Sequence, residues 1–326
     1  MKRTYPAAAV IRGQASQHTP DPERSANMAR MVFDVGGTAI KYSVMDETLK
    51  RWNSGEVSTP LDTQEHFFAV IEEIYRRYGA GTDGIAMSLP GFINTETGYC
   101  AGGGFLMYNH RRSVAPELSA VCGCPVKIAN DGKCAALAEL RLGALRGCTN
   151  AGVYILGTGV GGGIIVDGKV INGIHGTAGE YSFLRLQFDN WHDPDSTVGI
   201  QCSTTGLLGR YKRLKGLPKD APVDGRLFFE RVSEGESEAV TALDDFCGLV
   251  AKHITDLTIL LDLERVAIGG GISAQPVLLT TLQRALDDLY EHSGIYFDPG
   301  LPKTELVRCR FGSEANQVGA YLYYES

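Results

Sequence analysis

The chain has 326 residues, 44% of them hydrophobic, and a formal net charge of −7. That length can supply two domains with a core each, and an acidic chain without a basic stripe disfavours nucleic acid as a partner. No stretch approaches the ~20 apolar residues of a membrane span, and the N-terminus lacks an apolar core long enough for a signal peptide. We therefore expect a cytoplasmic protein with no membrane partner.

The N-terminal segment and the cysteines add two expectations. Residues 14–25 are polar, contain proline and show no periodicity, which predicts a disordered leader over residues 1–30. The eight cysteines are scattered through apolar or mixed segments rather than spaced as in a small secreted domain. We expect reduced and mostly buried thiols.

The first regular element is expected to be a β-hairpin over residues 31–46. Two short apolar runs flank the turn Asp34-Val-Gly-Gly-Thr38, whose adjacent glycines can present backbone N–H groups to a phosphate. The groups available for that contact are the backbone of Gly36 and Gly37, the Thr38 hydroxyl and the Lys41 ammonium. Asp34, at the end of the first strand, is placed to hold a hydrated Mg²⁺. A glycine pair is also common in ordinary hairpin turns, so this motif alone leaves both interpretations open.

Strands and helices alternate over the next hundred residues. Strands are predicted over 51–59, 83–91 and 125–130, and helices over 64–78, 116–121 and 132–145. The segment 98–109 contains Gly102-Gly-Gly104 and has little periodicity, so we expect a loop that lines a ligand cleft. Asn130 and Asp131 follow a strand and precede a helix, a position at which either side chain can simply cap the helix.

A second glycine-rich hairpin is expected over residues 151–167. Its segment Gly157–Gly162 matches the pattern G-x-G-x-x-G of dinucleotide-binding folds. That fold requires a helix after the glycines, whereas residues 164–171 are a β-branched run that predicts a strand. We therefore reject an NAD site. Two phosphate-type hairpins in one chain indicate a nucleotide held between two related lobes.

The C-terminal half continues the alternation. A loop over 175–180 carries one carboxylate, and the strand over 265–273 runs into a third glycine cluster. Further helices are predicted over 204–214, 237–261, 275–290 and 316–324, with another strand over 305–311. Strands and helices alternate in two successive halves, which predicts an α/β chain with two lobes.

These motifs together resemble the ROK family of sugar kinases, within the superfamily of actin-like ATPase domains, over roughly residues 31–324. The turn at Asp34–Thr38 resembles the first phosphate motif of that family, Leu156–Gly163 resembles the second, and Gly269–Ser273 resembles the motif that packs against adenosine. The segments 88–91, 130–131 and 175–180 follow in the family's order. The resemblance implies a two-lobed actin-like ATPase fold, which is ribonuclease H-like, with the active site in the interdomain cleft.

The resemblance also implies the domain limits, the reaction and the partners. The small lobe would comprise 31–142 plus 306–326, and the large lobe 143–305. The reaction would transfer the γ-phosphate of ATP, with Mg²⁺, to a hydroxyl of a hexose, an alcohol-group phosphotransferase. Glucose is the first candidate, before a β-glucoside and N-acetylmannosamine. A small-molecule sugar is thus the expected partner, and a homodimer is the default oligomer.

The resemblance implies site residues for catalysis, sugar binding and nucleotide binding. Asp131 would be the catalytic base. The residues implied for sugar binding are Gly103, Gly104, Asn109, Asn130 and Glu180. Those implied for the nucleotide are Asp34, Gly36, Gly37, Thr38, Lys41, Gly157, Thr158, Gly159, Gly161, Gly162, Gly270 and Gly271, with Asp34 reaching Mg²⁺ through water.

One departure from the family concerns zinc. Most members carry a histidine three residues after the sugar-binding glutamate and a cysteine-rich motif beyond it. Here the histidine position is Phe183, and the segment 195–205 retains only Cys202. One thiolate cannot form a tetrahedral site, so we expect no structural zinc. Since the lost residues also help to define sugar specificity in zinc-bearing members, the identity of the sugar stays open.

Two other classes of protein are weighed against a kinase. The family includes sugar-responsive transcriptional repressors, but residues 1–30 are too short and irregular for a winged-helix domain. A sugar-binding protein without catalysis is disfavoured by Asp34, Asp131 and both phosphate turns.

Overall fold

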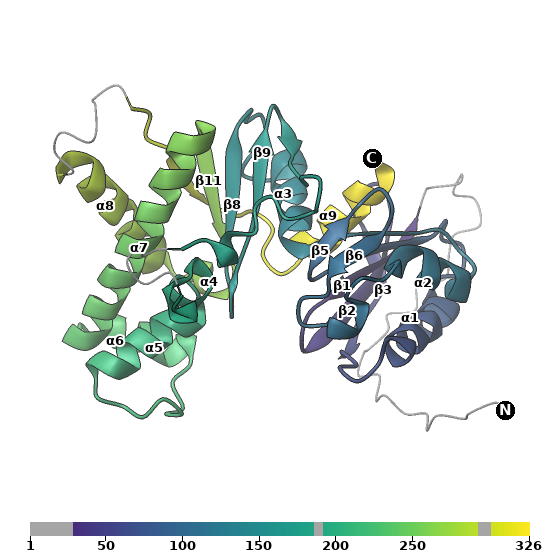
Figure 1. Ribbon diagram of the computed structural model, residues 1–326, viewed down its shortest axis with the longest axis horizontal. Helices are drawn as coiled ribbons and strands as arrows, with labels where there is room; N and C mark the ends of the chain where they lie inside the picture. Colours follow the sequence, from purple (N-terminus) through teal and green to yellow (C-terminus); the bar gives the residue numbers. More distant parts are fainter. Residues whose placement is uncertain (1–28, 186–191, 293–300) are drawn as a thin grey trace. The chain divides into compact units, whose positions relative to one another are not determined.

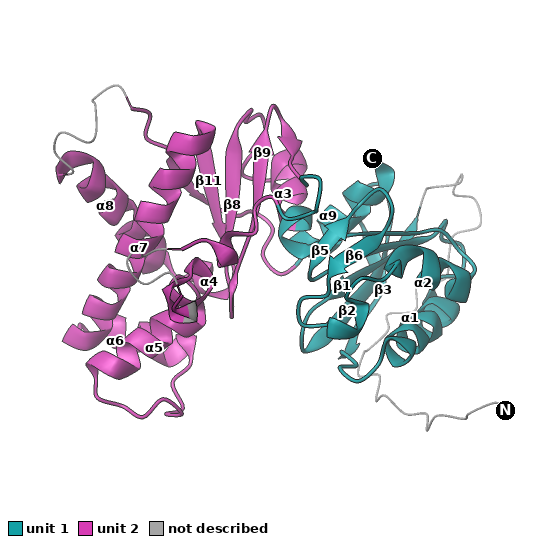
Figure 2. Cartoon of the chain, in the orientation of Figure 1, with its two compact units in different colours: residues 1–134, 172–177, 314–326 teal, residues 135–171, 178–313 magenta. Residues whose placement is uncertain are grey.

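The computed structural model describes residues 29–185, 192–292 and 301–326, which form two compact units (Figures 1 and 2). Unit 1 contains the described residues up to Cys134 together with Asn172–Thr177 and Glu314–Ser326. Unit 2 contains Ala135–Ile171 and the described part of Ala178–Ser313. Of the predicted leader, residues 1–28 lie outside the described residues. Its last two residues, Ala29 and Arg30, are buried.

Unit 1 is built on a five-stranded sheet in the order β3-β2-β1-β4-β7 (Figure 1). Its strands are β1 (Arg30–Val35), β2 (Ala39–Met45), β3 (Arg51–Ser58), β4 (Ile85–Leu89) and β7 (Val126–Asn130). β1 pairs antiparallel with β2 and parallel with β4, and β4 pairs parallel with β7. The predicted first hairpin is therefore confirmed. All six residues of β1 are buried, as expected for a strand covered on both faces.

Helices cover the two faces of this sheet. The helices of unit 1 are α1 (Gln64–Tyr78), α2 (Val114–Cys122) and α9 (Ala315–Glu325), and α3 (Asp131–Leu142) begins there. Alternate residues of β1 point to opposite faces, so Phe33 packs in the core cluster that contains Phe67 of α1. Asp34 points to the other face, where α9 packs. Thr63 caps α1 by accepting the His66 N–H at 3.1 Å.

The segment 98–109 differs from the expected loop. β5 (Phe92–Asn94) and β6 (Tyr99–Gly102) form a two-stranded sheet, and a short 3₁₀ helix, η1 (Met107–Asn109), follows. The prediction of a loop was wrong for residues 99–102 and 107–109, because a strand of four residues and a 3₁₀ helix of three give too few positions for a period to be recognised.

Unit 2 repeats the plan of unit 1 with the order β10-β9-β8-β11-β12. Its strands are β8 (Ala151–Leu156), β9 (Val160–Val166), β10 (Lys169–Val170), β11 (Arg265–Gly269) and β12 (Glu305–Arg308). β8 and β9 form the predicted second hairpin, and β8 pairs parallel with β11. β12, which the sequence analysis grouped from residue 306 onward with the first lobe, pairs with β11 of unit 2. The ion pair of Arg265 with Glu305, at 2.7 Å, lies at the start of this pairing.

Helices of unit 2 build the larger core. They are α4 (Val198–Gln201), α5 (Thr204–Leu214), α6 (Gly225–Ser233), α7 (Ser237–Leu261) and α8 (Pro276–His292), with 3₁₀ turns η2 (Tyr181–Phe183), η3 (Pro194–Ser196) and η4 (Gly271–Ala274). The long helix α7 packs against α8, α5 and α6. Side chains of α7, including Phe246 and Val250, share one core cluster with Tyr154 and Leu156 of β8.

All eight cysteines of the chain are free thiols, and five of them are buried. Among the described residues, no helix combines the length and apolar character needed to cross a membrane.

Candidate active site

Asp34 is the second-last residue of β1 and is 9% exposed. One of its carboxylate oxygens accepts a 2.9 Å hydrogen bond from the amide of Asn316 on α9. Burial raises the pKa of Asp34 above its usual value, while the Asn316 hydrogen bond and the charge of Lys41 act to lower it. Lys41 lies directly opposite Asp34 on β2. The structure thus places Lys41 beside Asp34, and Asn316 is a further partner that sequence reasoning missed.

The turn between β1 and β2 is fixed by Thr59. The backbone N–H of Thr59 donates to the Thr38 carbonyl at 3.0 Å, and its hydroxyl donates to the Gly36 carbonyl at 2.7 Å. Phe105 lies over Gly37, because a methyl group added there would be 3.7 Å from the Phe105 ring. Thr59 therefore fixes two carbonyls of the turn by hydrogen bonds. A glycine-containing backbone fixed in this way is of the kind that suits a phosphate.

Asn130 and Asp131 occupy the junction of β7 and α3. Asn130 accepts the backbone N–H of Lys133 at 3.1 Å and donates to the carbonyl of Gly91 at 3.0 Å. That is the N-cap arrangement, so Asn130 is the capping residue of the two candidates. Asp131 is the first residue of α3, and its carboxylate accepts the adjacent Gly132 N–H at 2.9 Å. The Asp131 carboxylate is not needed to cap the helix.

The Asp131 carboxyl group titrates above its usual range. Burial is the main reason that its pKa is raised, and the nearby charge of Asp34 raises it further, while the Gly132 N–H acts in the opposite direction. A carboxylate whose pKa is raised by a neighbouring carboxylate is stabilised in its ionised form by a cation. A divalent ion such as Mg²⁺, which prefers one or two carboxylates together with phosphate and water oxygens, fits this pair.

The loop implied for sugar binding packs beside Pro90 and Gly91. Gly104 adopts a φ of 57°, and a methyl group added to it would lie 3.3 Å from Pro90. A methyl group at Gly103 would come within 2.3 Å of the Leu106 carbonyl, so the backbone here closes on itself. Since Asn130 donates to Gly91, the structure brings Gly103, Gly104 and Asn130 to one edge of unit 1.

Asn109, which the resemblance implies for sugar binding, is enclosed within unit 1. It has no exposed surface, and its side-chain carbonyl accepts a 3.0 Å hydrogen bond from Gln64 of α1. Its amide nitrogen has no hydrogen-bond partner among the described residues. In this conformation Asn109 supports the loop from beneath. Gln64, at the start of α1, was missed because polar residues at helix N-termini are common for unrelated reasons.

In unit 2 the second glycine turn borders an open pocket of about 690 Å³. The Thr204 N–H donates to the Gly157 carbonyl at 2.9 Å, and the Thr205 hydroxyl donates to the Thr158 carbonyl at 3.0 Å. These bonds tie the turn to the first residues of α5. The pocket is lined by this turn and Gly271, by apolar side chains, among them Leu208, Val223, Phe229 and Ile272, and by polar or charged side chains, among them Asp224, Arg226 and Gln275. A pocket with such a mixed lining that ends in a glycine turn has the character of a purine nucleotide site.

The backbone beside this pocket requires a glycine at position 270. It has a φ of 91°, and a methyl group there would lie 2.2 Å from the carbonyl of Leu156 at the end of β8. Gly157, Thr158 and Gly271 line the pocket directly. Gly161 and Gly162 are instead paired residues of β9, opposite Ile155 and Tyr154.

Glu180, the carboxylate implied for sugar binding, belongs to unit 2. It is half-buried and precedes η2. Its neighbours Gly179 and Tyr181 both contact β9, since a methyl group at Gly179 would be 3.2 Å from Gly163 and the Tyr181 hydroxyl donates to the Gly163 carbonyl at 3.2 Å. The backbone on both sides of Glu180 is therefore held by one strand.

Comparison with known proteins identifies the family. The model of the ROK family matches residues 30–321. The chain belongs to the ROK family. It is 32% identical over 260 residues to an N-acetyl-D-glucosamine kinase of Vibrio atlanticus, covering 74% of this chain and 83% of that protein. It is 28% identical over 255 residues to a beta-glucoside kinase of Klebsiella pneumoniae, covering 78% and 85%.

Solved structures of the ROK family show the same fold. A ROK glucokinase of Streptomyces griseus, in complex with glucose and AMPPNP, superposes with a TM-score of 0.74 at 23% identity and covers 91% of this chain and all of that one. The chain thus has the actin-like ATPase fold of ROK sugar kinases. With its relatives it is a phosphotransferase that uses an alcohol group as acceptor.

The segment 195–205, which the resemblance aligns with the family's zinc motif, contains one cysteine. Cys202 is buried in the core of unit 2, and burial raises the pKa of its thiol to about 12. Within residues 29–185, 192–292 and 301–326, no cluster of three His, Cys, Asp or Glu side chains is placed to hold a metal ion. Phe183, at the position of the family's histidine, is 66% exposed.

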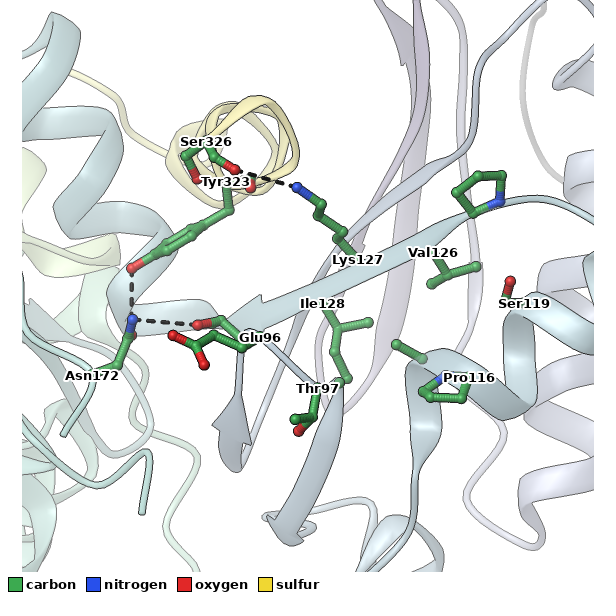
Figure 3. A pocket seen from close by; sticks show the side chains of 14 residues that line it. Glu96, Thr97, Pro116, Ser119, Val126, Lys127, Ile128, Asn172, Tyr323 and Ser326 are labelled. Carbon is green, nitrogen blue, oxygen red and sulfur yellow. Dashed lines mark hydrogen bonds between the residues drawn. The ribbon is translucent and has the colours of Figure 1, made fainter. Parts of the chain in front are cut away.

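A further pocket of this ROK protein lies in unit 1, beside the edge strand β7 (Figure 3). Its volume is about 640 Å³. Asn172 donates to the Thr95 hydroxyl at 3.3 Å and accepts from the Tyr323 hydroxyl at 3.5 Å. None of the site residues implied by the resemblance lines this pocket.

Proposed function

We propose that the chain transfers the γ-phosphate of ATP to a hydroxyl group of a glucose-like hexose. The observation that carries this proposal is the position of Asp131. It is a half-buried carboxylate at the first position of α3, released from helix capping by Asn130 and close enough to Asp34 for their charges to interact.

Asp131 would accept the proton of the attacking sugar hydroxyl and orient its oxygen. Its raised pKa supports this role, because a carboxylate is a better base when its pKa approaches the working pH. Asn130, Gly103, Gly104 and Glu180 would hold the other hydroxyl groups. Asn109 would keep the loop in place, since it is fully buried.

The nucleotide would be held mainly by backbone groups. The turns at Gly36–Thr38 and Gly157–Gly159 would donate N–H groups to the phosphates, and Lys41 would add a positive charge. The pocket beside Gly271 would take the adenine between its apolar side chains. Asp34 would hold Mg²⁺ through water, and the ion when bound would neutralise charge on the phosphates.

The identity of the sugar is the finer part of the proposal. Relatives at 27–32% identity carry the names N-acetyl-D-glucosamine kinase and beta-glucoside kinase. Glucose, β-glucosides and N-acetylated hexosamines are therefore the substrates to compare. We also propose a cytoplasmic homodimer, since a symmetric dimer is the commonest soluble oligomer.

A coupled assay of ADP release tests the proposal. Wild type and Asp131→Asn are compared with Mg-ATP against free hexoses, N-acetylated hexosamines and β-glucosides. We expect ADP release that depends on one of these sugars and falls steeply in the variant. Silence across the panel, from folded protein that binds ATP, would favour a sugar-binding protein without catalysis.

A further inference from the structure

Three aromatic side chains form a closed cluster in the core of unit 2. The rings of Tyr154 and Tyr181 stack at 5.4 Å, and His253 of α7 meets each of them edge-on at 5.5 Å. The Tyr154 hydroxyl and His253 Nδ1 share a 2.9 Å hydrogen bond. All three side chains are at most 4% exposed. We call Tyr154, Tyr181 and His253 the aromatic clamp.

Gly162 makes room for the clamp. It lies directly opposite Tyr154 in the β8–β9 ladder, and residues opposite each other in an antiparallel pair share one face of the sheet. The Tyr181 ring occupies the space above Gly162, where an added methyl group would be 2.2 Å from the ring. Real side chains do not approach so closely. A side chain at 162 must therefore displace Tyr181.

The clamp fixes the backbone next to Glu180. Tyr181 donates its hydroxyl to the Gly163 carbonyl at 3.2 Å, and its backbone N–H donates to the Gly179 carbonyl at 2.9 Å. Gly179, with a φ of 79°, packs against the same strand. Glu180 is thus held between two residues that are both fixed on β9.

We propose that Tyr181 is a positioning residue for the sugar, which holds the Glu180 carboxylate at a fixed place on β9 by means of the aromatic clamp. This inference rests on the proposed function, in which Glu180 binds sugar hydroxyl groups. It also assigns Gly162 a role other than contact with phosphate. Gly162 lies in the strand that follows the nucleotide turn. Its role is to leave space for the Tyr181 ring, which positions Glu180 for sugar binding.

Alanine substitutions at two adjacent glycines separate these roles. Gly162→Ala forces Tyr181 to move, whereas a methyl group at Gly161 would meet only the Ile155 side chain at 3.5 Å, an ordinary contact. We expect Gly162→Ala to raise the KM for sugar by about 10-fold or more, with the KM for ATP changed by less than about 3-fold. Gly161→Ala should leave the KM for sugar within about 2-fold of wild type. A rise in the KM for ATP alone in Gly162→Ala would overturn the proposal.

A smaller change at Tyr181 tests the proposal even if Gly162→Ala fails to fold. Tyr181→Phe keeps the ring and removes only the hydrogen bond to Gly163. This variant should raise the KM for sugar more than it lowers kcat. In the double variant Tyr181→Val with Gly162→Ala, the methyl group added at position 162 no longer meets the Tyr181 ring. The double variant should therefore have a KM for sugar no higher than Tyr181→Val alone. If the double variant instead showed the sum of the two single effects on the KM for sugar, the steric conflict between residue 162 and Tyr181 would be contradicted.

Amide hydrogen exchange tests the aromatic clamp without any enzyme activity, so it is independent of the proposed function. If the clamp holds Glu180, the amides of residues 179–184 should exchange faster in Gly162→Ala than in Gly161→Ala, with or without sugar. Unchanged exchange and an unchanged KM for sugar, in an active wild type, would overturn the clamp alone. A wild type without sugar-dependent ADP release would overturn the proposed function, and exchange would still decide whether the clamp holds Glu180.

Discussion

The side-chain amide of Asn316 donates a 2.9 Å hydrogen bond to the carboxylate of Asp34, 282 residues earlier in the chain. Helix α9 therefore contributes to the electrostatic environment of the residue that we propose for Mg²⁺. This contact stabilises the charged form of Asp34 against the effect of burial.

Replacement of Asn316 should move the acid limb of the pH–rate profile. Asn316→Leu removes the hydrogen bond that lowers the pKa of Asp34, so a larger fraction of Asp34 is protonated at a given pH. We expect the acid limb of kcat/KM for Mg-ATP to shift to higher pH. Gln317→Leu is the matched control, because Gln317 contacts Ser43 and Arg51 instead. An equal shift in both variants would contradict the assignment.

Asp131→Asn should lower activity and raise stability together. We expect kcat to fall by about 10²-fold or more, the scale of general-base loss. The pKa of Asp131 is raised in the folded protein, so its ionisation at neutral pH opposes folding, and that penalty disappears as pH falls toward 3.8. Urea unfolding should therefore show that the Asp131→Asn variant is more stable than wild type at about pH 7, with a smaller difference at about pH 4.5.

The control for that stability gain is Asp287→Asn. The hydrogen bond from Lys303 lowers the pKa of Asp287, so neutralising Asp287 should not stabilise the folded protein at neutral pH. If both variants gained stability equally, the gain would reflect net charge rather than burial of Asp131.

His253 should make the protein sensitive to mild acid. Burial lowers its pKa from 6.5 to about 4, so the unfolded chain binds more protons in this window and stability falls as pH decreases through it. A single group contributes a slope of at most about 1.4 kcal/mol per pH unit. Unfolding free energies measured between about pH 7 and pH 5 should show a smaller slope in His253→Leu. Thr255→Val, at another buried position of α7, removes no titratable group and should keep the wild-type slope.

Arg30 should be worth more to stability than a surface arginine. Its guanidinium is buried, pairs with Asp83 at 2.6 Å and Glu325 at 3.0 Å, and lies 4.5 Å from the centre of the Tyr324 ring. We expect Arg30→Met to lower the unfolding free energy by about 1–3 kcal/mol.

The matched control for Arg30 is Arg76→Met. Arg76 pairs with Glu72 at 2.6 Å but its side chain is 75% exposed, so its loss should cost less than about 1 kcal/mol. Equal effects of the two substitutions on the denaturation midpoint would show that the burial of Arg30 adds nothing.

The parts of the fold predicted from sequence are those with local causes. Helix α7 begins at Ser237 and ends at Leu261, as its apolar spacing predicts. Both glycine hairpins form because turn and flanking strands are adjacent in sequence. The β-branched run after Gly162 continues β9, which begins at Val160, so the glycines open no helix, in agreement with the rejection of a dinucleotide fold.

The parts that sequence did not reveal depend on distant contacts. Gln64 and Asn316 are ordinary polar residues of helices until the fold places them beside Asn109 and Asp34. Gly162 resembles a phosphate glycine in sequence, and only the position of Tyr181 shows what its missing side chain allows. No periodicity in the sequence encodes such pairings.

Unit 1 is assembled from stretches that include both ends of the described chain. Helix α9 packs on β1, β4 and β7, and it follows all five strands of that sheet in the chain. During synthesis the strands therefore emerge before α9, and the face of β1 that carries Val32 and Asp34 lacks this helix until unit 2 has been made. A nascent chain with the sheet of unit 1 but without α9 exposes apolar surface on that face, which is the kind of intermediate on which chaperones act.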